Sequence, residues 1–177
     1  DVLVISLHND HDSWSAETHP QACDISERGD GDGTGYTVNV PLPAGTGNDG
    51  YQYAMQELVD PVLDAYGPDA LLVSAGQDPG VVDPLGRNAV TKDGFEFLGR
   101  WARELAAEHA DGTLAVVQEG GYHLTHLAYA TLGVVEGALG VDTDVEDPFA
   151  WIDGDAASAR DAIDEAIAAH ADHWPLE

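Results

Sequence analysis

Basic residues are scarce in this chain of 177 residues. Lysine and arginine together number 6 against 33 aspartates and glutamates, which gives a net charge of −27 at pH 7. A surface without basic clusters cannot neutralise phosphates, so the composition argues against direct binding of nucleic acid. Because the acidic residues are spread along the whole chain, the charge indicates a halophilic host rather than a disordered acidic tail.

Cysteine and long apolar runs are lacking too. Cys23 is the only cysteine, which excludes an internal disulfide and fits a reducing compartment, the cytoplasm. No apolar run approaches the roughly 18 residues of a membrane span, and no signal peptide is present, so we expect no membrane partner. The chain passes from Asp1 straight into an apolar strand, and we therefore expect the sequence to begin inside a domain.

What the sequence does contain is an alternation of apolar strands and amphipathic helices. With 44% apolar residues in 177, the chain can build one domain with its own core. The alternation predicts an α/β fold, a parallel sheet with helices packed on it. The expected strands are 1–7, 36–40, 70–74 and 113–117, and the expected helices are 49–66, 94–110, 124–139 and 155–171.

The stretch 70–87 carries the first candidate site. Its first half is a short apolar run, typical of a strand buried on both faces. Asp78 and Asp83 follow, each before a proline, which holds the preceding residue in an extended conformation. Ligands bind at the carboxyl ends of parallel strands, so Asp78 is a candidate metal ligand or base. The alternative is that both aspartates only cap their own turns.

The second candidate is the tetrapeptide Glu-Gly-Gly-Tyr at 119–122, after the strand 113–117. Two glycines leave a bare backbone that a substrate can approach closely. Because both parallel strands end at one edge of the sheet, we expect Asp78 and Tyr122 to face one cleft. Tyr122 can donate a hydrogen bond to a carbonyl oxygen as it becomes an oxyanion. The alternative is a buried aromatic that begins a helix.

Five blocks of the chain resemble the histone deacetylase family in order and spacing. The likeness is greatest to class II and bacterial deacetylase-like amidohydrolases, with acetylpolyamine amidohydrolases as relatives. It covers residues 1–140, the carboxyl-terminal half of the family's domain. The blocks are Ser6-Leu7-His8, Gly33-x-Gly35-Tyr36-x-Val38-Asn39-Val40-Pro41, Ser74-Ala75-Gly76-x-Asp78, Asp83-Pro84-Leu85-Gly86 and Glu119-Gly120-Gly121-Tyr122.

The resemblance implies a three-layer arginase/deacetylase-like fold with helices on both faces of a parallel sheet. The whole chain, 1–177, would be a single α/β domain, the carboxyl-terminal portion of the family's catalytic domain. Residues 141–177 would be a carboxyl-terminal helical extension. The chain would thus form a partial domain.

The resemblance also implies zinc-dependent hydrolysis of acetyl-lysine or an acetylpolyamine. Asp78 matches a zinc ligand of the family, and Tyr122 matches the tyrosine that polarises the acetyl carbonyl. The implied potassium ligands are Ser6 and Leu7 at one site and the backbone carbonyl of Tyr36 at a second, and the implied substrate contacts are Gly120, Gly121 and Trp14.

Several parts of the family's site have no counterpart here. Its other two zinc ligands and its pair of basic histidines precede the block Ser6-Leu7-His8. A catalytic zinc site needs three protein ligands, so we expect this chain alone to be inactive and to associate with itself or with a missing amino-terminal half. The competing hypothesis is a non-catalytic α/β scaffold that binds a partner or a small acetylated ligand.

Overall fold

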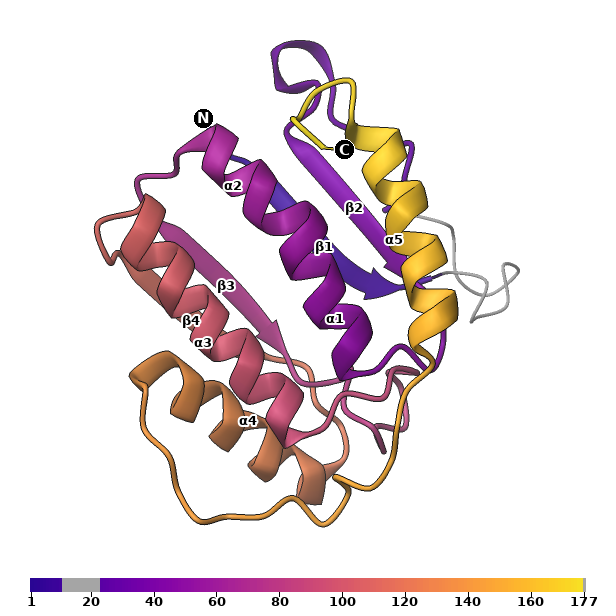
Figure 1. The fold of residues 1–177 in the computed structure, drawn as a ribbon, viewed down its shortest axis with the longest axis vertical. Coiled ribbons are helices and arrows are strands. Elements are labelled where there is room, and N and C mark those ends of the chain that lie inside the picture. Colours follow the sequence, from indigo (N-terminus) through magenta and orange to yellow (C-terminus); the bar gives the residue numbers. More distant parts are fainter. Residues whose placement is uncertain (11–22, 177) are drawn as a thin grey trace.

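The protein is known here from a computed structural model, which describes residues 1–10 and 23–176 (Figure 1). Trp14, a predicted substrate contact, lies outside the described residues. The predicted strands and helices are all found, with shifts of a few residues at their ends. The elements are β1 (Val4–Asn9), η2 (Gly31–Gly33), β2 (Thr37–Leu42), α1 (Asn48–Ala54), η3 (Met55–Val59), α2 (Asp60–Tyr66), β3 (Leu71–Gly76), α3 (Lys92–His109), β4 (Leu114–Glu119), α4 (Leu124–Leu139) and α5 (Ala156–His170).

The described strands form two parallel pairs, β1 with β2 and β3 with β4. In the first pair Val4 lies opposite Thr37. In the second pair Leu71 lies opposite Leu114 and Gly76 lies opposite Glu119, so both strands end at the same level. The parallel pairing confirms the predicted fold class and brings the segments that follow β3 and β4 to one edge.

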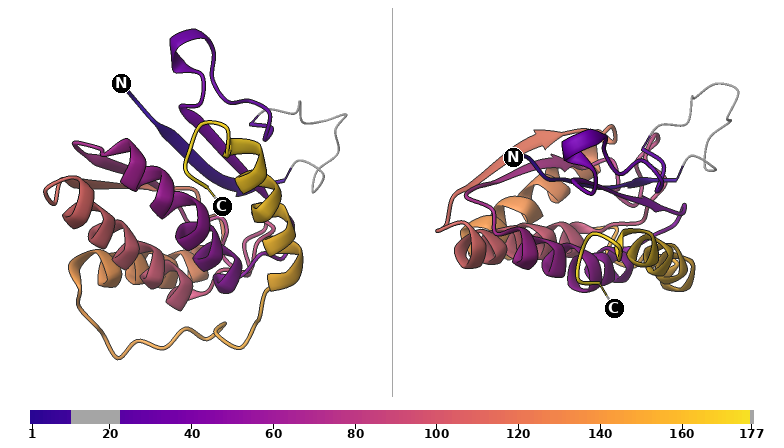
Figure 2. Two further views of the ribbon diagram at one scale, coloured as in Figure 1. Left: turned by 45° about the horizontal axis from the view of Figure 1, so that its top comes forward. Right: turned by 90° about the horizontal axis from the view of Figure 1, so that it is seen from above.

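Helices form a layer against the strands. Seen from above, α1, α3 and α5 lie side by side on one face of the strand layer (Figure 2). The buried apolar core lies between the two layers. It takes its largest side chains from β2, the helix 48–66, α3 and α5, namely Val38, Val40, Leu42, Tyr51, Leu58, Val62, Phe95, Leu105, Ile163 and Ile167.

The helix over 48–66 runs through Pro61, which would ordinarily break it. A π turn at Met55–Val59 precedes the proline, and the Asp60 N–H bonds to the carbonyl of Met55, five residues back. The wider turn leaves room for a ring that lacks an N–H, as π bulges do in long helices. The predicted apolar stripe therefore continues on both sides of Pro61.

The strand pair β3·β4 departs from the sequence prediction. Its apolar composition predicts burial on both faces, but Leu72 is 72% exposed and Val117 is 45% exposed. Alternate residues of β3 are exposed, so the described residues cover only one face of this pair. The apolar side chains of the other face remain accessible, a feature of surfaces that meet another protein or segment.

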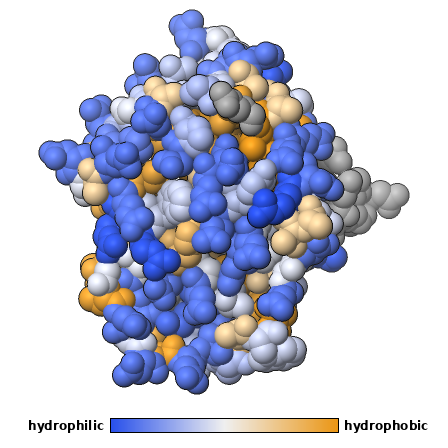
Figure 3. All heavy atoms as spheres, in the orientation of Figure 1, coloured by the Kyte–Doolittle hydropathy of each residue, from blue (hydrophilic) through white to orange (hydrophobic). Residues whose placement is uncertain are grey.

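The face that carries the helices is different. Its surface is largely hydrophilic, with small apolar patches (Figure 3). Within the described part of the chain, no helix combines the length and the apolar character that crossing a bilayer requires.

Candidate active site

The candidate site lies where β3 and β4 end. The Gln77 N–H bonds to the Glu119 carbonyl at 3.3 Å, so the two chains stay paired beyond Gly76. The segment 77–91 follows β3, and the residues 120–123 follow β4. This edge therefore presents Asp78 and Tyr122 on adjacent segments, and the shared cleft stays a prediction.

Asp78 contacts Gly120, the first glycine of the pair, directly. A Cβ atom added at Gly120 would overlap the Asp78 carboxylate, so the bare backbone of that glycine lies against the carboxylate oxygen. Gly120 also has a positive φ of 41°, a conformation that L side chains rarely adopt. Position 120 thus requires glycine for two reasons, its positive φ and the closeness of the Asp78 carboxylate.

Burial raises the pKa of the Asp78 carboxyl, more than a hydrogen bond within its own residue lowers it, and the charge of Asp83 raises it further. A carboxylate that is partly desolvated and faces a second negative charge is stabilised by a proton or a cation. Asp78 is therefore a chemically suitable single ligand for a metal ion.

The main chain of Tyr122 is held by a hydrogen bond, and its side chain is exposed. Its N–H donates to Asp83 Oδ2 at 2.6 Å, and the residue is 52% exposed. Gly121, just before it, has a φ of 85° and packs against Gln77 and Leu127. The alternative of a buried aromatic is thus wrong, and the main chain of Tyr122 is bonded to the loop that follows Asp78.

The described residues do not complete a metal site. Within residues 1–10 and 23–176, no three His, Cys, Asp or Glu side chains are grouped so that they could hold a metal ion. Zinc in a catalytic site takes three protein ligands and keeps one open position. Asp78 has the chemistry to fit such a centre as one member, but no group of three is formed within the described ranges.

The predicted potassium ligands occupy different places in the first strand pair. Ser6 and Leu7 lie within β1, opposite Asn39 and Val40 of β2. Tyr36 precedes β2 at its amino end, and its carbonyl accepts a hydrogen bond from Val4 N–H at 2.9 Å. The structure thus places Tyr36 before the amino end of β2, whereas Asp78 follows the carboxyl end of β3.

His126 packs against Gly80 in the segment that carries Asp78, a contact that the sequence does not reveal. Its ring is buried, and a Cβ atom added at Gly80 would overlap it. Burial lowers the pKa of His126, although Asp147 Oδ2, 3.6 Å from its Nε2, opposes the shift. His123 instead accepts a hydrogen bond from the His126 N–H at the start of α4. The three-residue spacing of His123 and His126 in the sequence does not show which histidine is buried and which one caps the helix.

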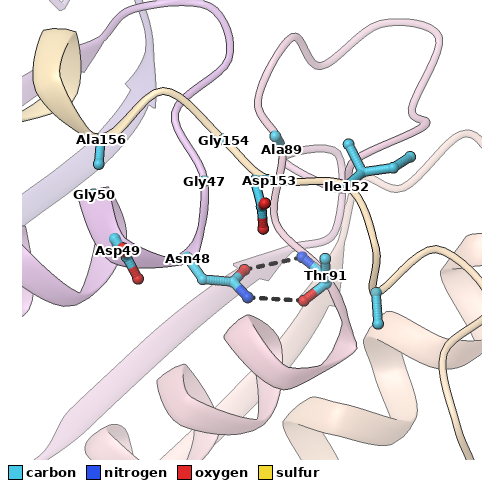
Figure 4. Close-up of a pocket in the computed structure, with 11 residues that line it drawn as sticks. Gly47, Asn48, Asp49, Gly50, Ala89, Thr91, Ile152, Asp153, Gly154 and Ala156 are labelled. Atoms are coloured by element: carbon cyan, nitrogen blue, oxygen red, sulfur yellow. Dashed lines mark hydrogen bonds between the residues drawn. The ribbon is translucent and has the colours of Figure 1, made fainter.

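A separate pocket of about 150 Å³ lies between the start of α1 and the segment that leads into α5 (Figure 4). Asn48 crosses it with two hydrogen bonds to Thr91, one from the Thr91 N–H at 3.0 Å and one to the Thr91 hydroxyl at 2.8 Å. Asp49 and Asp153 line it, and neither Asp78 nor Tyr122 does. The pocket is thus distinct from the candidate site.

Comparisons with known proteins agree with the resemblance. Residues 1–138 match the family described as histone deacetylase domain. The chain is 42% identical to histone deacetylase 8 of Arabidopsis thaliana, over 99% of this chain and 46% of that protein. It is 34% identical to a probable deacetylase of Archaeoglobus fulgidus, over 98% of this chain and 49% of that protein. It is 40% identical to a histone deacetylase-like amidohydrolase of Pseudomonas aeruginosa, over 84% of this chain and 38% of that protein.

Solved structures give the same result. The crystal structure of the HDA15 HD domain superposes with a TM-score of 0.80 at 29% identity, covering 98% of this chain and 44% of that chain. The histone deacetylase Clr3 superposes with a TM-score of 0.81 at 28% identity, covering 98% of this chain and 28% of that chain. The chain spans about half the length of the curated relatives that it matches first.

Proposed function

The chain belongs to the histone deacetylase family, and from this premise we propose that it supplies part of an amidohydrolase site that removes acetyl groups from amines. Asp78 and Tyr122 are its contributions to that site. The observation that carries the proposal is the contact of the Gly120 backbone with the Asp78 carboxylate. This contact brings the ends of β3 and β4 together beside an exposed phenol.

Tyr122 acts on the scissile amide. Its hydroxyl donates a hydrogen bond to the acetyl oxygen, and this bond strengthens as the oxygen takes on negative charge in the tetrahedral intermediate. The bare backbone at Gly120 and Gly121 allows the acetyl group to approach without a side chain in the way. Orientation of the phenol before the reaction lowers the cost of reaching this geometry.

Asp78 would bind zinc as one of several ligands. Its raised pKa, caused first by burial, and its closeness to Asp83 support a cation there. The remaining ligands would come from outside the described residues, which is the sense in which we propose that the chain is incomplete. Potassium at Ser6 and Leu7 and at Tyr36 stays a prediction, as do the substrate contacts of Gly120 and Gly121.

The substrate is proposed to be an acetylated lysine or an acetylated polyamine. Both belong to molecules that carry further positive charges, which an acidic surface with a net charge of −27 favours over neutral or acidic substrates. The same charge supports a salt-rich host, and the single Cys23 supports a reducing cytoplasmic location.

The test uses the complete gene product. We expect it to retain zinc after dialysis and to hydrolyse an acetyl-lysine peptide or acetylated spermidine. Tyr122→Phe should lower kcat by about 10²–10³-fold, the typical effect of losing one oxyanion donor. Tyr129→Phe, which removes a hydroxyl from α4, the helix that follows Tyr122, is the matched control and should leave kcat unchanged. Wild-type protein that cleaves neither substrate would contradict the proposed function.

The second candidate is a non-catalytic scaffold that binds a partner or an acetylated ligand. It is favoured by the fact that the described residues do not complete a metal site. It predicts a gene product that binds acetyl-lysine or a protein partner, holds no zinc, and has no hydrolytic rate for Tyr122→Phe to reduce. Zinc content therefore separates the two candidates.

A further inference from the structure

Asp83 uses its two carboxylate oxygens in different directions. Oδ1 accepts hydrogen bonds from the N–H groups of Leu85 at 2.8 Å and Gly86 at 2.9 Å, which close its own turn. Oδ2 accepts the N–H of Tyr122 at 2.6 Å, from the segment that follows β4. One side chain thus folds the loop after β3 and joins it to the loop after β4.

The Tyr122 end of this link needs an anchor. The two residues before it are glycines with positive φ, 41° and 85°, and glycine backbones have the widest conformational freedom. The phenol is exposed, so packing against its ring contributes little to its direction. The hydrogen bond at the Tyr122 N–H therefore restrains the residue itself, in addition to the packing of the two glycines before it.

The Asp83 end of the link is held to the Asp78 segment. The Asp83 N–H bonds to the Gly80 carbonyl at 2.9 Å. Gly86 lies directly against the Asp78 carbonyl, where an added Cβ atom would overlap it. The position of Asp83 is thus tied to that of Asp78, and its Oδ2 sets where Tyr122 stands relative to the acid.

We propose that Asp83 is a positioning residue, which holds Tyr122 in register with Asp78 through its Oδ2 hydrogen bond to the Tyr122 N–H. This inference rests on the proposed function, since the register matters for catalysis only if both residues act on one substrate. Asp83 does not touch the reacting atoms. It acts through the main chain of Tyr122.

Asp83→Asn separates this role from that of the local turn. An asparagine keeps the oxygen that accepts from Leu85 and Gly86 but turns an NH₂ group toward the Tyr122 N–H, so two donors then face each other. The turn survives and the link between the two loops breaks. The matched control is Asp155→Asn. Asp155 likewise accepts backbone N–H groups, those of Ala157 and Ser158 at the start of α5.

In the complete, zinc-loaded gene product, Asp83→Asn should lower kcat by about 10²-fold, since small misplacements of a catalytic group have effects of this size. KM should change little, and Asp155→Asn should leave kcat unchanged. In a Tyr122→Phe background the same Asp83→Asn substitution should change kcat less than about twofold, because Asp83 acts through the phenol. A loss that persists in that background would overturn the proposal and point instead to the charge that Asp83 places near Asp78.

A measurement on the wild-type protein tests the link without a substitution. The Tyr122 amide should exchange its hydrogen roughly tenfold more slowly than an open amide, despite its exposed position. Free exchange would overturn the proposal.

A Tyr122→Phe variant with the wild-type rate would contradict the proposed function itself. A slow Tyr122→Phe variant with a fast Asp83→Asn variant would overturn only the positioning role.

Discussion

The ammonium group of Lys92 lies 2.6 Å from the carboxylate of Glu136, and the two side chains are only 5% and 1% exposed. Burial alone would raise the pKa of Glu136, but the bonds from Lys92 and Thr143 outweigh burial and hold this pKa below its ordinary value of 4.5. Burial alone would lower the pKa of Lys92, and Glu136 reverses that shift. Both residues are therefore charged in the folded protein, and they join the start of α3 to α4.

Removing one partner of this pair should destabilise the protein strongly. Lys92→Met leaves the Glu136 carboxylate buried without a counter-charge, and we expect the free energy of unfolding to fall by about 3–5 kcal/mol. The double substitution Lys92→Met with Glu136→Leu should recover most of that loss. Urea unfolding measures both. The exposed pair Arg100 and Glu96, at 3.3 Å, is the control, and Arg100→Ala should cost less than about 1 kcal/mol. Equal effects at the two pairs would contradict the prediction.

Acid should weaken the fold through two buried histidines. Burial lowers the pKa of His126 and of His170 below the ordinary value of 6.5. Each group binds a proton more readily in the unfolded chain, so its contribution to stability is complete above pH 6.5 and is lost as the pH falls through its folded pKa. We expect the urea midpoint to be lower near about pH 5 than near about pH 7.5.

The matched variants for this effect are His126→Asn and His170→Gln. Each removes one titrating group, so the difference in unfolding free energy between the two pH values should shrink. The charged groups that face the histidines are Asp147, His123 and Asp83 around His126, and Arg28 and His173 around His170. An unchanged difference in both variants would assign the acid sensitivity to those groups.

Salt should stabilise the protein. With a net charge of −27, the compact state repels itself, and the repulsion is screened over a Debye length that shrinks from about 10 Å at about 0.1 M salt to about 3 Å at about 1 M. We expect the thermal midpoint to rise between these concentrations of potassium chloride. A variant with several exposed glutamates of α3 and α5 changed to glutamine should show a smaller rise. A midpoint that does not depend on salt would contradict the proposed adaptation.

Gly86→Ala should disrupt the site by steric overlap alone. The added Cβ atom would overlap the Asp78 carbonyl, and the φ of Gly86 is not in the positive range. We expect a loss of about 1–3 kcal/mol in stability from the forced shift, with lower zinc content and kcat in the complete gene product. Gly33→Ala is the control, because open space surrounds that position. Full zinc content in the Gly86→Ala protein would show that Asp78 does not depend on this close approach.

Local patterns in the sequence predicted most of the fold. Apolar runs bounded by turn residues predicted the strands, and spacing of three and four residues predicted the helices, because both follow from which side chains meet the core. The helix 48–66 was predicted from its apolar stripe although it contains Pro61. The π turn at Met55–Val59 explains why the proline does not break it. Strand β2 likewise runs through Pro41, a residue tolerated because β2 has a described partner on one side only.

Of the candidate site, the sequence predicted the two strand ends and missed the supports between them. Asp78 and Tyr122 follow apolar runs, so their place at the edge of a sheet could be expected. The bond from Asp83 to the Tyr122 N–H joins segments that are 39 residues apart. The burial of His126 beneath Gly80 likewise joins residues from different segments. No spacing along the chain encodes such contacts.

The sequence by itself determined the class of the fold, the strand order along the chain, the charge and the two residues that face the shared edge, because these depend on local periodicity and composition. Tertiary structure alone decided three things: that Gly120 touches the Asp78 carboxylate, that Lys92 is neutralised by Glu136, and that one face of β3·β4 stays uncovered by the described residues. Contact, burial and pKa depend on atoms brought together from distant parts of the chain, and only the folded arrangement specifies their distances.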